Sequence, residues 1–225
     1  MKVALDTDVL IAAVRSRLGA SRAWVRAILS GEADLLLSVP LALQYEAVLT
    51  RPEQLAASGA SVEQIQALLD VLCAVCTPVE ISFLWRPMLR DADDEMVLEV
   101  AVNGGADRLL TFNERDFAGG RPARRDGRAP RPGLAVMEER MTQANYALRL
   151  QASLKAEAER LAKAEGTTLN QFINVAVAEK IAALRTADFF RERARRADLP
   201  AALALLDRLG GDDPPRSGDE LEEAR

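Results

Sequence analysis

The stretch RDADDEMVLEVAVNGGADRLLTFNERDF, residues 90–117, puts acidic residues before a helix-like apolar pattern and polar residues after a strand-like one. Residues 93–105 have helical periodicity, and Gly104 and Gly105 are expected to end that helix. Residues 107–112 predict a short buried strand. Helix and strand in alternation are typical of α/β proteins, and the acids at both ends of this unit either cap local structure or converge in space.

The alternation extends over the first 136 residues. Strands are predicted at residues 1–5, 33–39, 78–82 and 133–137, and helices at residues 9–17, 21–32, 41–49 and 61–75. Ser61 and Gln64 are spaced as a capping box at the start of the last of these helices. We therefore expect residues 1–136 to form an α/β domain, a parallel sheet flanked by helices.

The pattern changes after Met141. Residues 145–151 alternate like a strand, and residues 153–166 and 167–184 have amphipathic helical patterns. A strand-helix-helix domain over residues 141–184 is too small to bury a core alone, so it should dimerise or dock. Residues 185–225 predict one or two helices followed by a polar, disordered tail.

Composition limits the chemistry available. The chain has 225 residues, a formal net charge of -5 and no histidine. The lack of histidine excludes Ser-His-Asp and Cys-His catalysis and His-containing zinc sites, so hydrolysis here would use acids and a metal. The sequence contains no run of 18 or more apolar residues, so no ordinary membrane span is expected. Met1 leads directly into a predicted strand, and no secretory signal is expected. We expect a cytoplasmic protein.

Two further features have mainly structural interpretations. Cys73 and Cys76 lie within a helical pattern and are interpreted as small core residues, with a redox or metal role as the alternative. Residues 118–133 are rich in Arg, Gly and Pro. They predict either a solvated loop or a basic lip that holds a nucleic-acid backbone.

The acidic residues follow the strands in a suggestive order. Ligands of parallel sheets bind at the carboxyl ends of the strands, where Asp6, Asp94, Asn113 and Asp116 are expected. Glu46 lies in an apolar helical pattern, and its burial is costly without a partner. Clustered carboxylates repel one another, and Mg²⁺ or Mn²⁺ removes that conflict. The pattern therefore favours metal-dependent phosphodiester hydrolysis.

Each acid also has a structural alternative. Asp6 suits a turn or a helix N-cap, and Asp116 suits a turn. Asp91 and Asp93 at a helix start favour the helix dipole in any protein, and we prefer that interpretation for both.

Residues 2–14, 41–52, 90–117 and 133–137 together resemble the PIN domain, in its branch of bacterial toxin components. The resemblance covers residues 1–136 and implies a Mg²⁺- or Mn²⁺-dependent ribonuclease. It implies that the acidic site is formed by Asp6, Glu46 and Asp94, with a fourth position shared between Asn113 and Asp116.

Two positions depart from the family pattern. Asp8 stands where Asn or Ser is more usual and adds charge, while Asn113 stands where many members have Asp and weakens a second metal position. Thr7 is implied to help hold a metal-bound water.

Residues 145–184 resemble a ribbon-helix-helix domain of antitoxin repressors. Two such strands from two chains form a ribbon that fits the DNA major groove. Asn145, Arg149 and Gln151 lie on one face of the strand and are expected to contact bases. Thr168 begins the second helix, whose N–H groups can hold a phosphate. The alternative is a dimerisation module without DNA contacts.

The tail has features of an inhibitor of the nuclease. Phe189 and Phe190 suit a hydrophobic groove, and an arginine placed among Asp6, Glu46 and Asp94 would displace a cation. The candidate arginines are Arg191, Arg193, Arg195 and Arg196, and the sequence does not distinguish between them. A solvated amphipathic helix is the alternative.

These interpretations combine into a toxin–antitoxin fusion. A ribonuclease at residues 1–136 is restrained by a fused antitoxin that binds operator DNA and autoregulates transcription, with residues 185–225 as the neutralising tail. The expected partners are RNA, operator DNA and a second copy of the chain, or a higher oligomer, and no membrane. Two alternatives are a DNA-binding transcriptional regulator with an inert PIN-like domain, and an active nuclease that the small domain only dimerises.

Overall fold

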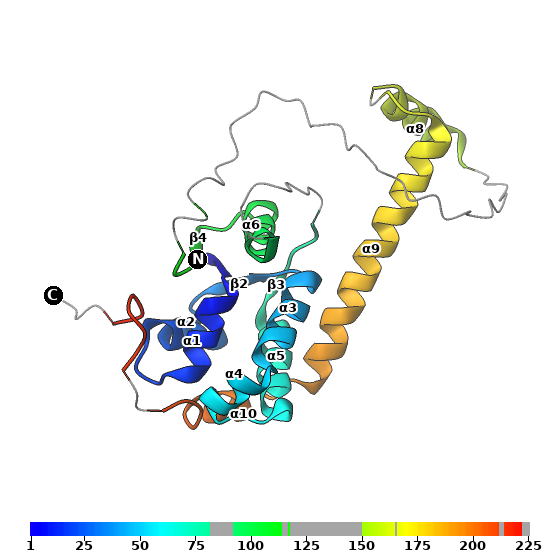
Figure 1. Cartoon of the computed structure of the whole chain (residues 1–225). Helices are drawn as coiled ribbons and strands as arrows, with labels where there is room; N and C mark the ends of the chain where they lie inside the picture. The colour runs from blue at the N-terminus through cyan, green and yellow to red at the C-terminus, as the bar shows by residue number, and fades with distance from the viewer. Residues whose placement is uncertain (82–91, 114–116, 118–149, 165, 212–213, 222–225) are drawn as a thin grey trace. The chain divides into compact units, whose positions relative to one another are not determined.

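The computed structural model describes residues 1–81, 92–113, 117, 150–164, 166–211 and 214–221 (Figure 1). Contacts divide the chain into two units. One combines Met1–Arg121 with Ala183–Arg225, and the other is Pro122–Ala182. The end of the chain thus belongs to the same unit as its beginning, although we expected residues 185–225 to be a separate segment.

The first unit contains the predicted parallel sheet. Strands β1 (Lys2–Leu5), β2 (Asp34–Leu37), β3 (Thr77–Pro78) and β4 (Arg108–Leu110) are all parallel, in the order β3-β2-β1-β4. Val3–Leu5 and Leu35–Leu37 are buried, as expected for strands that are covered on both faces. The strand predicted at 78–82 is shorter and begins at Thr77, and the one predicted at 133–137 lies outside the described residues.

Helices α1 (Thr7–Arg15), α2 (Ala20–Leu29), α3 (Val39–Leu49), α5 (Val62–Val75) and α6 (Ala92–Gly104) correspond to the predicted helices. The capping box at the start of α5 is present, because the side chains of Ser61 and Gln64 each accept a hydrogen bond from the other residue's backbone N–H. Gly105 follows α6 with φ +64°, a left-handed conformation that ends the helix.

One helix was not predicted. Helix α4 (Pro52–Ser58) starts with proline at its first position and is followed by Gly59 at φ +69°. Proline just inside the start and glycine just past the end are sequence signals of a helix, so this short element was recognisable in principle.

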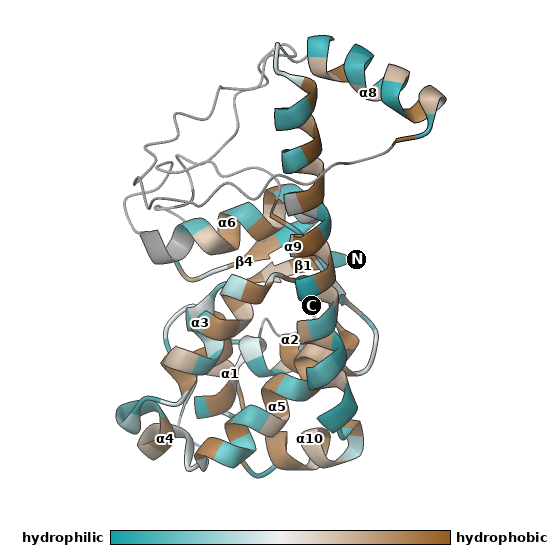
Figure 2. Ribbon diagram, turned by 90° about the vertical axis from the view of Figure 1, so that its right-hand side faces the viewer, coloured by the Kyte–Doolittle hydropathy of each residue, from teal (hydrophilic) through white to brown (hydrophobic). Residues whose placement is uncertain are grey.

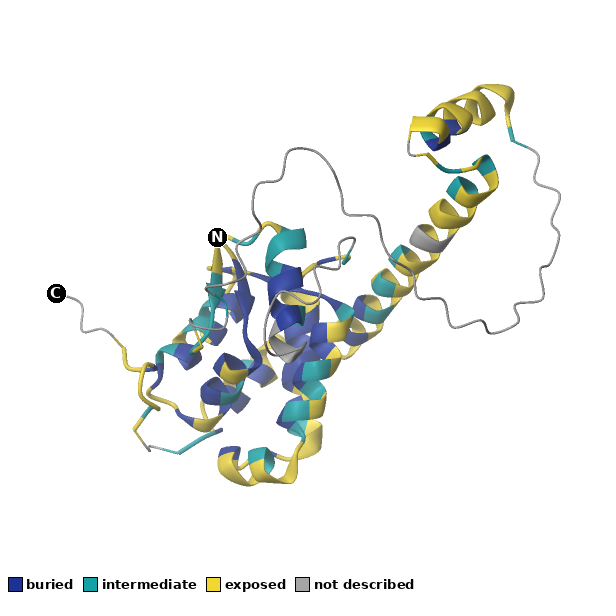
Figure 3. Cartoon of the chain, turned by 45° about the horizontal axis from the view of Figure 1, so that its top comes forward, coloured by how far each residue is buried: buried dark blue, intermediate teal, exposed yellow. Residues whose placement is uncertain are grey.

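The C-terminal residues complete the core of the first unit. Helix α9 (Leu169–Arg196) continues past Leu184, where we expected a helix to end, and α10 (Leu199–Leu206) contacts α5 and α2. Phe190, Leu205 and Leu209 belong to the same buried cluster as the strands. Figure 3 shows the buried residues of the first unit concentrated around the sheet. A fragment that ends before α9 would therefore expose apolar core surface.

A buried arginine ties α2 to this C-terminal part. Arg22 is 4% exposed and donates hydrogen bonds to the carbonyl oxygens of Ala13, Leu206 and Leu209. Burial lowers the pKa of Arg22 to about 10. Such a group stays buried only because its donors are satisfied.

Residues 214–221, for which we expected disorder, have a defined path. Asp219 is 1% exposed, and its side chain accepts a hydrogen bond from the N–H of Ser21 at 2.6 Å. The chain end is therefore attached at the start of α2.

The second unit contains α8 (Ala152–Ala164) and the first part of α9. Both helices are mixed in hydropathy (Figure 2) and largely exposed, with Leu154, Val175, Val177 and Ile181 among the exposed apolar side chains. Most of the predicted ribbon strand lies outside the described residues, and Leu150 and Gln151 are in no strand of this chain. The two helices agree with the helical part of the β-α-α prediction.

Two further observations concern membrane-spanning helices and the two cysteines. No helix in the described part of the chain combines the length and apolarity that crossing a bilayer requires. Cys73 and Cys76 are free thiols, and burial raises the pKa of each to about 12. They behave as core residues rather than reactive thiols.

Candidate active site at the carboxyl edge of the sheet

The ends of β1 and β4 bring Asp6 next to Thr111. The N–H of Asp6 donates to the carbonyl of Leu110 at 2.9 Å, which extends the β1–β4 pairing by one residue. The Thr111 hydroxyl then donates to Asp6 Oδ2 at 2.6 Å, and it accepts from the N–H of Asn113 at 2.9 Å. Asp6 and Asn113, two predicted metal ligands, are thus linked through Thr111.

Asp6 lies where β1 ends and α1 begins. It occupies the N-cap position of α1, where its side chain makes no fully formed capping hydrogen bond, although the backbone N–H groups of Thr7 and Asp8 lie close enough to interact with it. It is 6% exposed, and burial raises its pKa. The nearby charge of Asp8 adds to that rise, while the hydrogen bond from Thr111 and the backbone N–H groups of Asp8 and Thr7 oppose it. A buried carboxyl group with raised pKa is stabilised in its charged form by a cation.

Thr7 Oγ1, on the residue after Asp6, is buried and has no hydrogen-bond partner among the described residues. The same condition occurs at other positions of the described chain, at Gln44 Oε1, Gln54 Oε1 and Asp219 Oδ2. Gln44 precedes Tyr45, whose hydroxyl donates to the carbonyl of Leu5 at 2.5 Å and so holds α3 against the end of β1. Unsatisfied buried oxygens are uncommon, and Mg²⁺ and Mn²⁺ prefer oxygen ligands.

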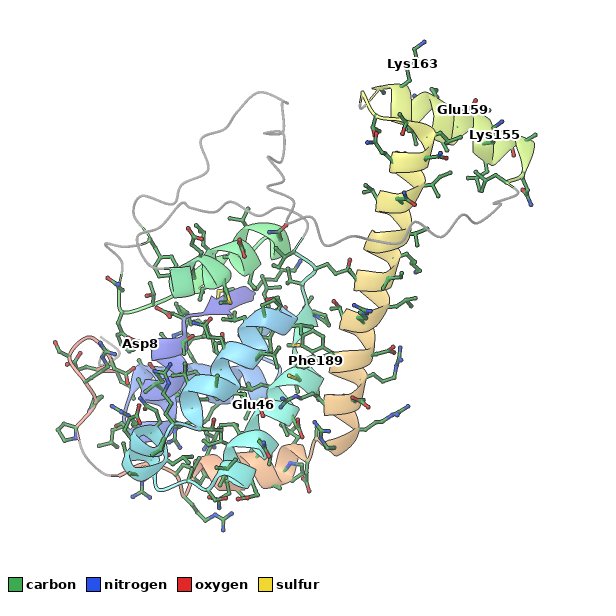
Figure 4. All side chains as sticks on the ribbon, turned by 45° about the vertical axis from the view of Figure 1, so that its right-hand side comes forward. Asp8, Glu46, Lys155, Glu159, Lys163 and Phe189 are labelled. Atoms are coloured by element: carbon green, nitrogen blue, oxygen red, sulfur yellow. The ribbon has the colours of Figure 1, made fainter. Side chains whose placement is uncertain are left out.

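Glu46 lies in a different environment. It pairs with Arg193 of α9 and accepts a hydrogen bond from Gln66 of α5 at 3.2 Å. It lines a pocket of about 420 Å³ together with Glu63, Gln66, Ala67, Asp70, Arg193 and Arg196. Asp6 does not line this pocket. Figure 4 shows Glu46 well away from Asp8, the residue two positions after Asp6.

Helix geometry explains the position of Glu46. Successive residues of an α-helix are rotated by roughly 100°, so Gln44 and Glu46 project in directions about 200° apart. Since Glu46 faces α5 and α9, Gln44 lies on nearly the opposite side of α3.

The tail residues pack beside the pocket. Arg193 contacts Asp70 at 3.1 Å and lies over the ring of Phe189, with 5.4 Å from the guanidinium carbon to the ring centroid. Phe190 is buried in the core, and Arg191 is exposed and pairs with Asp188 on its own helix. Among the predicted tail arginines, Arg193 therefore pairs with Glu46 and Asp70, and Arg195 is exposed.

Other predicted site residues fall partly outside the described residues. Asp94 is in the first turn of α6, but its side chain is not described, and neither is any part of Asp116, Asn145 or Arg149. Within the described residues, no three acidic or cysteine side chains are grouped to hold a metal. In the second unit, Gln151 is exposed.

Thr168 caps α9. It accepts a hydrogen bond from the N–H of Gln171 and donates its own N–H to the Gln171 side chain, both at 3.2 Å. The start of α9 is therefore where the sequence predicted it.

Several residues of these two regions were not predicted from the sequence. Thr111 had a recognisable signal, because it follows β4 as directly as Asp6 follows β1. Asp70 had another, because it lies in the apolar run LLDVL and is 5% exposed. Glu95 and Glu99, one turn apart on α6, are also buried.

Comparison with known proteins agrees with this geometry. A family model described as PIN domain matches residues 2–115, just over half of the 225 residues, from β1 to just past β4. No curated protein and no solved structure matched the chain. PIN domains are generally metal-dependent nucleases. The match contains Asp6, Thr111 and the whole described sheet, and the chain therefore belongs to the PIN-domain family.

Proposed function

We propose that the protein is a divalent-metal-dependent ribonuclease, fused to a ribbon-helix-helix antitoxin that binds operator DNA. The nuclease proposal depends mainly on Asp6, a buried carboxylate at the carboxyl edge of a parallel sheet with no cationic partner among the described residues. In α/β sheets this edge is where ligands bind.

The residues present suit Mg²⁺ or Mn²⁺. Asp6, Asp94, Asn113 and Asp116 are the proposed ligands, and the unpartnered hydroxyl of Thr7 is proposed to help hold a metal-bound water. A cation held there would lower the pKa of a bound water and stabilise charge on a phosphate. The chain's own contribution is orientation, because the Thr111 hydroxyl fixes one oxygen of Asp6.

Glu46 is the proposed catalytic residue with the least structural support. Its carboxylate is already neutralised by Arg193, so it would have to lose that ion pair before it could bind a cation. The pairing fits an anchoring role for the tail, and substitution of Glu46 separates the two roles.

The antitoxin part of the proposal is supported by the second unit. Exposed apolar side chains on α8 and α9 are not covered by the described residues of their own unit, as expected for a module that dimerises. The capped start of α9 at Thr168 is suited to a DNA phosphate. Asn145, Arg149 and Gln151 are the proposed base-contacting residues.

Restraint of the nuclease is proposed to come from the tail. Phe189, Phe190 and Arg193 hold α9 on the first unit through core contacts and two buried or half-buried carboxylates. Because the inhibitor is part of the same chain, its effective concentration is high and its stoichiometry is fixed.

A second candidate is a DNA-binding regulator with an inert PIN domain. The observations that favour it are the ion pair that occupies Glu46 and the presence of Asn113 where an acid would hold a second metal better. This candidate requires DNA binding without RNA cleavage.

Cleavage of labelled single-stranded RNA by the full chain tests the nuclease proposal. The full chain is required because residues 183–221 contribute to the core. Because the tail is proposed to restrain the nuclease, we expect slow cleavage by the full chain with Mg²⁺ or Mn²⁺, none with chelator, and none from Asp6→Asn in either condition. Cleavage that persists in chelator, or in the Asp6→Asn variant, would rule out the proposed site.

Selection of bound sequences from a random DNA library tests the antitoxin part. The full chain should enrich a palindromic site, and Arg149→Ala should abolish that enrichment while the chain stays dimeric. Dimerisation without any enriched sequence would leave a nuclease whose small domain only dimerises.

A further inference from the structure

The C-terminal segment, residues 214–221, returns to the carboxyl edge of the sheet. Arg216 Nη1 lies 3.5 Å from Asp8 Oδ2, and the guanidinium carbon is 4.2 Å from the centroid of the Phe112 ring. Asp8 is two residues after Asp6, and Phe112 directly follows Thr111. Arg216 therefore contacts residues on both chain segments that form the Asp6–Thr111 pair.

A buried anchor fixes the position of Arg216. The N–H of Asp219 donates to the carbonyl of Arg216 at 2.9 Å, which closes a turn with Gly218 at φ +89°. Asp219 accepts from the N–H groups of Ala20 and Ser21, at 2.7 and 2.6 Å, at the start of α2. The anchor is enclosed, since Asp219 is 1% exposed.

Gly19 makes room for this anchor. A Cβ atom at position 19 would lie 2.0 Å from Asp219 Oδ2 and 2.8 Å from its Cγ. Any larger residue there would push the Asp219 side chain out of its place. The turn that carries Arg216 thus depends on a glycine almost 200 positions earlier in the chain.

Arg216 is available to an external anion. Its ion pair with Asp8 is long and exposed, with half of each side chain accessible, and such pairs are weak. A guanidinium stacked on an aromatic ring is a common element of single-stranded RNA recognition. The protein is acidic, and its carboxylates repel the negatively charged RNA. The positive charge of Arg216 offsets part of that repulsion.

We propose that Arg216 binds a phosphate of the RNA strand that is cleaved in the proposed active site around Asp6. The C-terminal segment would then form part of the substrate-binding surface. This inference rests on the proposed ribonuclease function. A blocking role for Arg216 fits the contacts less well, because Arg216 pairs with the exposed Asp8, whereas Asp6 accepts its hydrogen bond from Thr111.

Binding of fluorescent single-stranded RNA to the full chain in chelator, followed by anisotropy, tests the proposal without cleavage. Arg216→Ala should weaken binding about five- to tenfold and reduce the salt slope of log K by about 0.7, the loss of one phosphate contact. Arg208→Ala is the matched control, since Arg208 is an exposed arginine of the same C-terminal part. It should bind within about twofold of wild type.

Cleavage kinetics distinguish substrate binding from a blocking arm. If Arg216 binds RNA, Arg216→Ala raises KM with kcat nearly unchanged. Faster cleavage by Arg216→Ala, or RNA affinity equal to wild type, would overturn the proposal. Weaker RNA binding by Arg216→Ala in a chain that never cleaves would uphold Arg216 as an RNA contact and refute the nuclease function instead.

Gly19→Ala tests the anchor while Arg216 is kept. The displaced Asp219 should release the turn and weaken RNA binding as much as Arg216→Ala does, with circular dichroism used to confirm folding. A folded Gly19→Ala variant with wild-type affinity would show that the anchor does not position Arg216. Because Arg216 is half-exposed, its own substitution remains a valid test if Gly19→Ala fails to fold.

Discussion

Asp6 and Asp70 are buried to nearly the same extent, with 6% and 5% of each residue exposed, but the fold treats them differently. Asp70 contacts two arginines of α9, Arg193 at 3.1 Å and Arg196 at 2.8 Å. Asp6 contacts the neutral hydroxyl of Thr111 and has the charged Asp8 nearby. Burial alone therefore does not separate a structural acid from a functional one. The charge of the neighbours does, because it decides whether the protein itself supplies the counter-ion.

The largest predicted difference between Asp6 and Asp70 is in the rate of RNA cleavage. Asp6→Asn should lower RNA cleavage about 10³-fold, roughly 4 kcal/mol in the activation free energy, because a carboxylate ligand is lost. Asp70→Asn, measured in parallel under conditions where it is folded, should not lower kcat by more than about threefold, and any release of the tail would raise it. Equal losses of kcat in the two folded variants would remove the distinction between the two sites.

The next effect concerns stability. Arg193→Ala should lower the free energy of unfolding by about 3 kcal/mol, because it leaves the buried Asp70 short of a counter-charge. Urea denaturation measures it. Arg191→Ala is the control, since Arg191 is exposed and pairs only three residues away, and it should cost under about 0.5 kcal/mol. An Arg193→Ala variant as stable as the control would contradict an anchoring ion pair.

Glu46→Gln tests which of the two regions Glu46 serves. Its pairing with Arg193 predicts that kcat falls by no more than about threefold, or rises as the tail loosens, and that stability falls by about 1 kcal/mol. The catalytic role implied by family resemblance predicts instead a loss of kcat above about 100-fold. Single-turnover cleavage and urea denaturation of one variant give both values.

The smallest expected effect is the pH dependence that Asp6 adds to stability. Its folded-state pKa is raised, so ionisation of Asp6 opposes folding, and stability is lost as pH rises through the folded pKa. Asp6→Asn should therefore be more stable than wild type near pH 7 without metal. The difference should disappear below the ordinary carboxyl pKa of 3.8. A constant difference across that range would mean that Asp6 is not the titrating group.

Much of the first unit followed from local patterns in the sequence. The parallel sheet, five of its helices, the Ser61 capping box and the glycine stop of α6 were predicted, because each depends on residues close together in the chain. Helix α4 was missed although proline and glycine marked its ends. The position of Asp6 at a strand end also followed from the pattern alone.

The partners of the acids did not follow from the sequence. Glu46 was selected for its apolar surroundings, but its pairing with Arg193 joins residues 147 positions apart. The contact between Arg216 and Asp8 spans 208 positions. No local pattern encodes such contacts, because they depend on how α9 and the C-terminal segment pack against α5, α1 and α2.

From periodicity and strand order, which are local properties, the sequence by itself determined most elements of the PIN domain and the place of Asp6 at the carboxyl end of β1. Only the tertiary structure decided which acids keep their charge unneutralised. That choice depends on the arginines that the C-terminal residues bring to Asp70 and Glu46, and on the hydroxyl rather than an arginine that β4 brings to Asp6.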